Sequence, residues 1–375
     1  MRNVVVTGSN GFIGRNLITY LSANPNLAIL PLDVEASSEQ LQATLEQADF
    51  VFHLAGTNRP EHPDEFKTGN SELTRTVVET LKGTGRPVPV LLSSSSQAEL
   101  DNPYGTSKKE AEEAVLHYGR ETGAPVYVFR LPNVFGKWSR PNYNSAVATF
   151  CHNVAHGLPL QVNDPDRELQ LVHIDDVIHS FIATLEGTSK PDGNGTYSAH
   201  HPYRIRLGEL AHRIQGFPAT RAMRELPDIG EELTRLLYSM YLTYLPQNQF
   251  SYPLEMKHDA RGWLAEFIRT PNAGQIFIST TKPGITRGNH WHHTKTEKFL
   301  VIQGEALILF RAINGDQVIK YPVSSDHLEV VDIPPGYTHS ITNTGTSDLL
   351  TLFWASEPFD PERPDTQNLT VIIAN

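Results

Sequence analysis

Residues 4–14 read VVVTGSNGFIG, and this stretch decides the fold of the first half of the chain. Three glycines recur at three-residue spacing between an apolar, strand-like run and the helix-like run RNLITYL at 15–21. In a strand–loop–helix unit such glycines allow a tight turn and close approach to a pyrophosphate, and the helix N-terminus offers amide donors to the phosphates. A glycine triplet alone is weak evidence, and a ligand-free turn is the alternative, but the flanking strand and helix favour a dinucleotide site. We expect the loop to bind the cofactor through Gly8, Gly11, Phe12, Ile13 and Gly14.

Residues 3–135 alternate short apolar runs with helix-like periods. This alternation is typical of a parallel sheet with crossover helices, and it predicts an α/β Rossmann domain. The expected strands lie at 3–7, 28–33, 49–55, 88–93 and 126–131. The expected covering helices lie at 38–47 and 70–82.

The length of 375 residues exceeds what one hydrophobic core usually supports, so two domains are expected. Residues 141–245 are more helical and irregular, and we interpret them as a cap on the nucleotide domain. After PQNQFSYP at 246–253 the sequence changes to short strands separated by Gly, Asn, Asp and Pro, which is typical of an all-β barrel. The predicted domains are therefore 1–245 and 246–375.

Composition excludes several classes of function. The net charge of -11 argues against a nucleic-acid surface, because phosphate binding requires clustered Lys and Arg. The one cysteine, Cys151, excludes a disulfide framework and a Cys-rich zinc site, so any metal must be held by His and carboxylate. No apolar run approaches about 18 residues, so we expect no membrane association and a cytoplasmic protein.

A reductase pair is predicted in YGTSK at 104–108. Tyr104 and Lys108 are one helical turn apart and share a face. A neighbouring ammonium lowers a phenol pKa, which lets Tyr104 deliver a proton to a carbonyl oxygen, and Lys108 can also hold the cofactor ribose. From the serine run 93–96, Ser95 is expected to hydrogen-bond the carbonyl. A surface tyrosine on a charged helix is the alternative for any single match, but the glycine loop in the same domain favours the catalytic interpretation.

The choice between NAD and NADP stays open in the sequence. Asp33, at the end of the second expected strand, suits a ribose hydroxyl and repels an added phosphate, whereas Arg15 favours the phosphate.

The N-terminal part resembles the extended short-chain dehydrogenase/reductases through TGxxGxxG, HLAG at 53–56, YGTSK and RLPNVFG at 130–136. The resemblance implies that Asn133 and the run LVHIDD at 171–176, including His173, contact a sugar-nucleotide substrate. The alternative is that Asp175 and Asp176, the acidic residues of this run, stabilise the N-terminus of a helix and contact no ligand. The cofactor is implied to contact Leu54, Ala55 and Gly56.

A second constellation lies in GITRGNHWHHTKTE at 284–297 and IPPGYTHSITN at 333–343. His290 and His292 are two apart in a probable strand and so face the same side. With Glu297 and His339 they form a three-imidazole, one-carboxylate set that suits zinc, and also manganese, iron or nickel.

These runs resemble the paired motifs of the cupin superfamily, except that Leu328 stands where the second motif's leading glycine is expected. They also resemble the metal-free sugar-nucleotide 3,5-epimerases. In that alternative Arg287 and Lys298 bind substrate and His290 is the proton-abstracting base.

Taken together, six runs across both domains resemble the bifunctional capsular polysaccharide synthesis enzymes of the CapF type. The resemblance implies that the cupin epimerises carbon 3 of a UDP-linked 4-keto-6-deoxy-N-acetylhexosamine and that the reductase then delivers hydride to carbon 4, giving UDP-2-acetamido-2,6-dideoxy-β-L-talose. It also implies NADPH, zinc and a homodimer formed through the cupin. The alternatives are a single-activity 4-ketoreductase with a dimerising cupin and a regulator built on an inactive reductase fold; retention of Tyr104 and Lys108 disfavours the latter. The six runs that carry the resemblance to the CapF type lie at 54–61, 93–98, 102–105, 135–145, 250–253 and 288–295.

Overall fold

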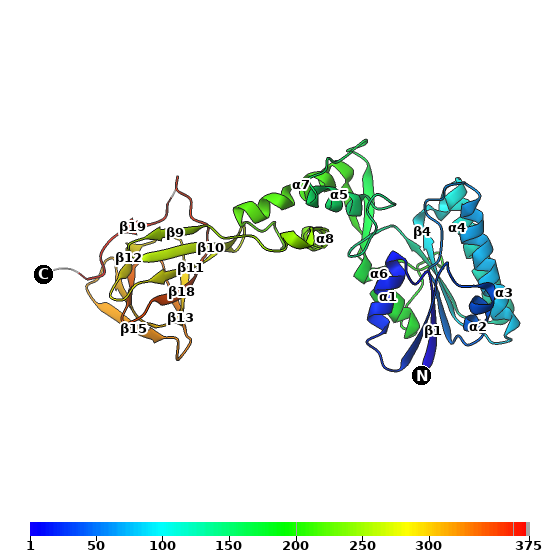
Figure 1. Ribbon diagram of the computed structural model, residues 1–375, viewed down its shortest axis with the longest axis horizontal. Coiled ribbons are helices and arrows are strands. Elements are labelled where there is room, and N and C mark those ends of the chain that lie inside the picture. Colours follow the sequence, from blue (N-terminus) through cyan, green and yellow to red (C-terminus); the bar gives the residue numbers. More distant parts are fainter. Residues whose placement is uncertain (200, 363, 373–375) are drawn as a thin grey trace. The chain divides into compact units, whose positions relative to one another are not determined.

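The computed structural model describes residues 1–199, 201–362 and 364–372. By internal contacts the chain divides into two compact units (Figure 1). The first unit comprises residues 1–215 and 239–245, and the second comprises 216–238 and 246–375.

The first unit is built on a five-stranded parallel sheet of order β2-β1-β3-β4-β5. The predicted α/β Rossmann fold is confirmed, and each expected strand is present, β5 with the expected bounds and the other four with shifted ends. Thus β4 begins and ends two residues later than expected, which leaves Ser95 as its last residue. The strands are β1 (Arg2–Thr7), β2 (Leu27–Leu32), β3 (Phe50–His53), β4 (Val90–Ser95) and β5 (Val126–Leu131).

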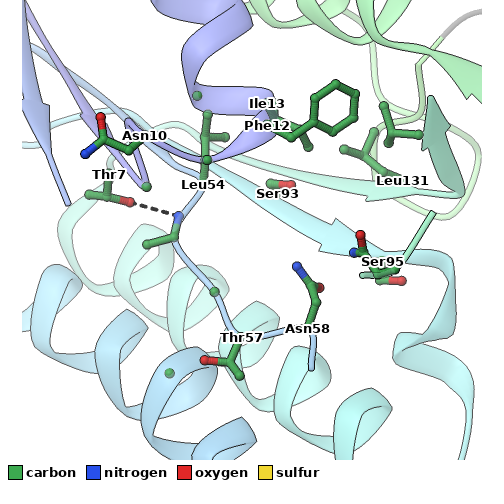
Figure 2. A pocket seen from close by; sticks show the side chains of 18 of the residues that line it. Thr7, Asn10, Phe12, Ile13, Leu54, Thr57, Asn58, Ser93, Ser95 and Leu131 are labelled. Carbon is green, nitrogen blue, oxygen red and sulfur yellow. Dashed lines mark hydrogen bonds between the residues drawn. The ribbon is translucent and has the colours of Figure 1, made fainter. Parts of the chain in front are cut away.

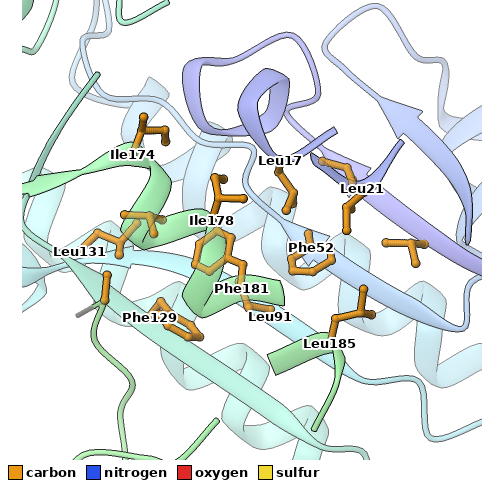
Figure 3. Close-up of a cluster of buried hydrophobic side chains, with 14 of the residues drawn as sticks. Leu17, Leu21, Phe52, Leu91, Phe129, Leu131, Ile174, Ile178, Phe181 and Leu185 are labelled. Atoms are coloured by element: carbon orange, nitrogen blue, oxygen red, sulfur yellow. The ribbon is translucent and has the colours of Figure 1, made fainter. Parts of the chain in front are cut away.

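Helices cover both faces of this sheet, because successive strand residues point to opposite sides. In β1, Val4 and Val6 pack with α1 (Phe12–Leu21) and α6 (Ile174–Leu185), as Figure 3 illustrates for this core. Val5 packs in a separate cluster on the other face. That face is covered by α2 (Ser38–Leu45), α3 (Leu73–Gly83) and α4 (Pro103–Thr122).

A smaller sheet, of order β6-β7-β8, completes the first unit. A π-helical turn (Lys67–Glu72) precedes α3 and so accounts for the start of the helix predicted at 70–82. Helices α7 and α8 contain residues of both units. The remaining elements are β6 (Asn133–Phe135), α5 (Ala146–Ala155), β7 (Glu168–His173), β8 (Tyr203–Arg206), α7 (Leu207–Met223) and α8 (Glu232–Leu242).

The second unit contains two antiparallel sheets, so the predicted all-β cupin architecture is confirmed. Their orders are β16-β13-β18-β11-β10-β9 and β15-β14-β17-β12-β19. Side chains such as Phe299, Ile308 and Phe353 form the core. The strands are β9 (Met256–Asp259), β10 (Gly262–Thr270), β11 (Gly274–Thr281), β12 (Thr286–Trp291), β13 (Glu297–Gln303), β14 (Glu305–Ala312), β15 (Val318–Ser324), β16 (Val330–Ile333), β17 (Tyr337–Asn343), β18 (Leu349–Ala355) and β19 (Gln367–Asn368).

Among the described residues, none of the helices combines the length and apolar character needed to span a bilayer.

Candidate active sites

The glycine motif after β1 leaves no room for a side chain at Gly8 or Gly14. Gly8 has φ +67°, and a Cβ there would lie 2.8 Å from the backbone of Ala55. A Cβ on Gly14 would lie 2.2 Å from the Gly8 carbonyl oxygen. The Ala55 amide donates to Thr7 Oγ1 at 3.2 Å, which ties the end of β1 to the segment after β3 (Figure 2). The glycines therefore let two backbone segments close around one edge of the sheet.

A cavity of about 1120 Å³ opens at this edge, at the carboxyl ends of the strands. This is where open α/β sheets bind their ligands. Every residue that we expected at the cofactor lines it, as do Ser95 and Asn133. The cofactor set is Gly8, Gly11, Phe12, Ile13, Gly14, Asp33, Leu54, Ala55, Gly56, Tyr104 and Lys108.

Tyr104 and Lys108 lie in the first turns of α4. This helix begins with Pro103 at its first position and with the Asn102 side chain accepting from the Gly105 amide. The Lys108 Nζ lies 5.8 Å from the centre of the Tyr104 ring. The Tyr104 hydroxyl donates to Asn58 Oδ1 at 3.0 Å. Asn58, from the run TNRP after β3, is a contact that sequence reasoning missed.

The electrostatics of this pair differ from the expectation. Burial raises the pKa of the Tyr104 phenol, with the Ser95 side chain acting in the opposite direction, so the predicted lowering of this pKa is wrong. Burial also lowers the pKa of Lys108 to about 8, and Glu112 opposes this shift. The Lys108 ammonium donates to the Ser93 carbonyl at 3.4 Å. Tyr104 is therefore held as a neutral proton donor.

Asp33 is fixed at the end of β2, within the first cavity. Its Oδ2 accepts from the Asn10 amide at 2.5 Å and from Ser9 Oγ at 3.3 Å, and its Oδ1 accepts from the Val34 amide at 2.8 Å. The carboxylate is thus anchored on the glycine loop. Arg15, also at the cavity, stacks over the Trp138 ring at 5.3 Å.

The two residues expected at the substrate on β6 and β7 have different surroundings. Asn133 lines the cavity and donates from Nδ2 to the Gln170 carbonyl. His173 is not among the lining residues. Its ring accepts from the Asp175 amide at 3.3 Å, capping α6, and packs 5.2 Å from the Phe135 ring. This is the helix-cap arrangement that the sequence left open as the alternative.

In the second unit the four predicted metal ligands converge. His290 comes from β12, His292 follows it, Glu297 begins β13 and His339 lies in β17. One potential ligand atom from each lies within 4.8 Å of the others. The Nε2 atoms of His292 and His339 lie 3.3 and 3.4 Å from Glu297 Oε2. Both Nε2 atoms are buried and have no hydrogen-bond partner among the described residues, so the donor set fits a divalent cation.

The charges of this cluster suit the same role. Burial works against ionisation of Glu297, but His292 and His339 hold the pKa of its carboxyl well below the ordinary value. Burial, assisted by His339, lowers the pKa of His290 to about 4. At neutral pH the cluster therefore offers a carboxylate and a neutral His290 imidazole, the forms that bind metal.

A cavity of about 590 Å³ adjoins the cluster, and His290, Glu297 and His339 line it. Arg287 also lines it, fixed by bonds to Thr281 Oγ1 at 3.0 Å and to the Thr280 carbonyl at 2.9 Å.

Lys298 does not reach the second cavity. It follows the inward-facing Glu297 on β13, points outward and pairs with Asp332 on β16. Two other lysines line the cavity, Lys257 and Lys295, and Arg261 lines it as well. Sequence reasoning missed all three, although strand alternation already places Glu297 and Lys298 on opposite faces.

Comparison with known proteins relates the whole chain to one group of enzymes. Residues 4–199 match the NAD dependent epimerase/dehydratase family. A UDP-2-acetamido-2,6-beta-L-arabino-hexul-4-ose reductase from Pseudomonas aeruginosa is 47% identical over 368 residues, which are 98% of each protein. The chain belongs to the NAD dependent epimerase/dehydratase family. Within that family, residues 257–367 add a match to the polysaccharide biosynthesis C-terminal domain.

Solved structures extend the relationship. The capsular polysaccharide assembling protein CapF from Staphylococcus aureus matches with a TM-score of 0.92 and 46% identity, over 98% of this chain and 100% of that one. The resemblance to enzymes of the CapF type is thereby confirmed. A UDP-glucuronic acid 4-epimerase from Bacillus cereus matches 58% of this chain and 83% of its own with a TM-score of 0.52 and 18% identity, a likeness of fold alone.

Proposed function

We propose that the chain is a bifunctional nucleotide-sugar enzyme. Its second unit epimerises carbon 3 of a UDP-linked 4-keto-6-deoxy-N-acetylhexosamine, and its first unit reduces the 4-keto group to give UDP-2-acetamido-2,6-dideoxy-β-L-talose for polysaccharide synthesis. The observation that carries this proposal is that each unit has its own cavity lined by its own proton-transfer or metal-binding groups. The P. aeruginosa relative, named for reduction at carbon 4 of a UDP-2-acetamido sugar, supports the substrate class.

In the reduction, the nicotinamide cofactor supplies the hydride. Tyr104 gives its hydroxyl proton to the keto oxygen, and the hydrogen bond to Asn58 keeps that hydroxyl oriented as a donor until a carbonyl replaces Asn58. The cationic Lys108 stabilises the phenolate that remains. Ser95, at the end of β4, provides the second contact to the carbonyl oxygen.

In the epimerisation, the proton at carbon 3 leaves to a base and returns on the opposite face, while negative charge on the neighbouring keto oxygen is stabilised. His290, His292, Glu297 and His339 would hold zinc or another divalent cation, which when bound supplies that charge stabilisation. In the metal-free alternative His290 is the base, and its neutral imidazole is able to accept a proton at neutral pH. Arg287 binds the substrate in either case.

The cofactor of the reduction is NADPH by analogy with the CapF type, with NADH as the alternative. The anchored Asp33 carboxylate supports NADH, because it would repel a 2′-phosphate. Initial rates with the two cofactors at equal concentration decide between them.

We also propose that the chain forms a homodimer through its second unit. The large apolar side chains Tyr321, Leu328 and Val330 are exposed there, and exposed apolar side chains suit an interface. Light scattering during gel filtration measures the mass of the assembly, and a monomer at micromolar concentration would refute this part.

The division of labour is tested with two variants and the UDP-linked 4-keto-6-deoxy-N-acetylhexosamine. Wild-type protein without nicotinamide should incorporate deuterium at carbon 3 in deuterated water, as followed by NMR. Tyr104→Phe should keep this exchange and lose cofactor oxidation by about 100-fold or more, since one proton donor contributes about 10²–10⁴. His290→Ala should lose exchange and keep the reductase step on pre-epimerised substrate.

Matched controls are Tyr118→Phe, on the same helix α4 with its hydroxyl bonded to the Val88 carbonyl, and His293→Ala, at an exposed position directly after His292. Both should keep both activities. Loss of both activities in folded Tyr104→Phe or His290→Ala would refute the two-site proposal. No exchange by wild type, with cofactor still consumed, would leave the single-activity 4-ketoreductase with a non-catalytic second unit.

A further inference from the structure

The C-terminal segment 365–371, here called the strap, lies directly on the metal-ligand cluster. Its short strand β19 pairs with β12, so that Asn368 is opposite His290 and Gln367 is opposite Trp291. The strap is thus a neighbour of the ligands in space, although it follows them by more than twenty residues in sequence.

The first contact of the strap is with a ligand itself. The ring Nδ1 of His292 hydrogen-bonds to the main-chain carbonyl oxygen of Asp365. A carbonyl only accepts, so Nδ1 carries the proton and Nε2 is left with its lone pair. That Nε2 is the buried, unpartnered atom that faces Glu297. Asp365 therefore fixes both the orientation and the tautomer in which His292 can bind a metal.

The Asp365 carboxylate makes a second set of contacts. It accepts from the backbone amides of His293 at 2.8 Å, Thr294 at 2.8 Å and Lys295 at 2.9 Å. These three residues lie in the turn that joins His292 to Glu297. One side chain thereby holds the loop that sets the spacing between two ligands.

Leu369 and Val371 of the strap contact the residues directly before the other two histidines. The Leu369 amide donates to the Asn289 carbonyl at 2.9 Å, and the Val371 amide donates to Asn289 Oδ1 at 3.2 Å. Asn289 adopts φ +61° directly before His290, at a bulge in β12. The Thr338 hydroxyl, directly before His339, donates to the Leu369 carbonyl.

The far end of the strap is anchored by a buried guanidinium. Arg311 donates to the carbonyls of Thr370 at 2.8 Å and Val371 at 2.9 Å. The Arg311 side chain is buried, and a buried guanidinium without hydrogen-bond partners would be strongly destabilising. The two strap carbonyls supply such partners. The strap is therefore fixed at both ends.

We propose that the strap is the positioning shell of the metal site, with Asp365 as its principal positioning residue. The inference rests on the metal site of the proposed function and deepens it. Removing partners that orient a ligand typically costs about 10–100-fold in metal affinity. Asp365→Ala keeps the main-chain carbonyl that contacts His292 but removes the carboxylate that holds the turn between His292 and Glu297. We therefore expect it to bind a divalent cation about 10–100-fold more weakly than wild type.

The experiment uses the full chain, stripped with a chelator and titrated with Zn²⁺ in competition with a chromophoric chelator. Asp365→Asn should lose less affinity than Asp365→Ala, because its amide oxygen still accepts from the turn. Thr338→Val, nearly isosteric, should also weaken binding, because it removes the strap bond beside His339. The matched control is Asp360→Ala, whose carboxylate accepts from the nearby Glu362 amide at 2.9 Å; it should bind like wild type.

The outcomes separate this inference from the proposal beneath it. Wild type that binds no Zn²⁺ would remove the metal site and the inference with it. If wild type binds Zn²⁺ and both Asp365→Ala and Thr338→Val bind it with the same affinity, the metal site stands but the positioning role of the strap is refuted. Circular dichroism and cofactor oxidation by the first unit check folding, and if Asp365→Ala is misfolded, the affinities of Asp365→Asn and Thr338→Val decide.

Discussion

Replacing Lys108 by Met should stabilise the first unit while removing reductase activity. Lys108 is 7% exposed, and burial lowers its pKa from the ordinary 10.5 to about 8. A shift of that size corresponds to about 3 kcal/mol of destabilisation of the charged form in the folded protein. That pKa already includes the opposing effect of Glu112, whose carboxylate is paired with Arg130 at 2.7 Å. Met has a similar length and needs no solvation, so the variant should gain up to about 3 kcal/mol in free energy of unfolding at pH 7.

The pH dependence provides a sharper check than the stability at one pH. Between pH 8 and 10.5 the unfolded chain keeps the Lys108 proton and the folded chain has released it, so wild-type stability rises with pH through this window. Below pH 8 both states are protonated and the full cost is present. The advantage of Lys108→Met should therefore be largest at pH 7 and should vanish near pH 10.5.

The assay is urea unfolding without nicotinamide, followed by the helical circular dichroism signal, at pH 7 and at pH 10. The control is Lys109→Met, the next residue of α4, which is exposed and should change stability by less than about 0.5 kcal/mol. A Lys108→Met variant no more stable than wild type at pH 7, or one with the same advantage at both pH values, would refute the reasoning.

Three further predictions concern the cofactor, the core and the metal. Asp33→Asn should raise the NADPH-to-NADH ratio of kcat/KM by about tenfold, equivalent to about 1.4 kcal/mol, because it removes a charge that opposes the 2′-phosphate; an unchanged ratio would contradict this role. Phe181 of α6 is fully buried against the sheet, so Phe181→Ala should lower the free energy of unfolding by about 3–5 kcal/mol in denaturant titrations. A loss below about 1 kcal/mol would mean that the core there is loosely packed. Removing divalent metal with a chelator should lower the thermal midpoint of the second unit in calorimetry, because an ion present at 100 times its Kd stabilises the native state by about 2.7 kcal/mol. If adding Zn²⁺ back to the stripped protein leaves the midpoint unchanged, the metal site is contradicted.

The local patterns in the sequence were sufficient for most of the fold and for the centre of each site. The glycine spacing predicted the loop after β1, because only glycine accommodates the contact of Gly8 with Ala55. Helical periodicity placed Tyr104 and Lys108 on one face, and the paired histidine runs gave the cluster around Glu297. These features follow from backbone geometry over a few residues.

Electrostatics and side-chain direction were less predictable. The sequence suggested that Lys108 lowers the pKa of Tyr104, but burial has the larger effect, and burial is a property of the packed helix and sheet. Lys298 was expected at the substrate, but the pleat of β13 turns it outward. His173 matched the motif, but it caps α6 outside the first cavity.

The sequence by itself determined which chemistry the chain carries: a dinucleotide loop, a tyrosine–lysine pair and a histidine–glutamate cluster, each encoded by residues close together in the chain. Only the tertiary structure decided which distant residues hold those groups in place. Asn58 meets Tyr104 from 46 positions away, and Asp365 meets the turn after His292 from about 70 positions away. No local pattern encodes such contacts, because they depend on loops and strands that become neighbours only when sheets pair and cores pack.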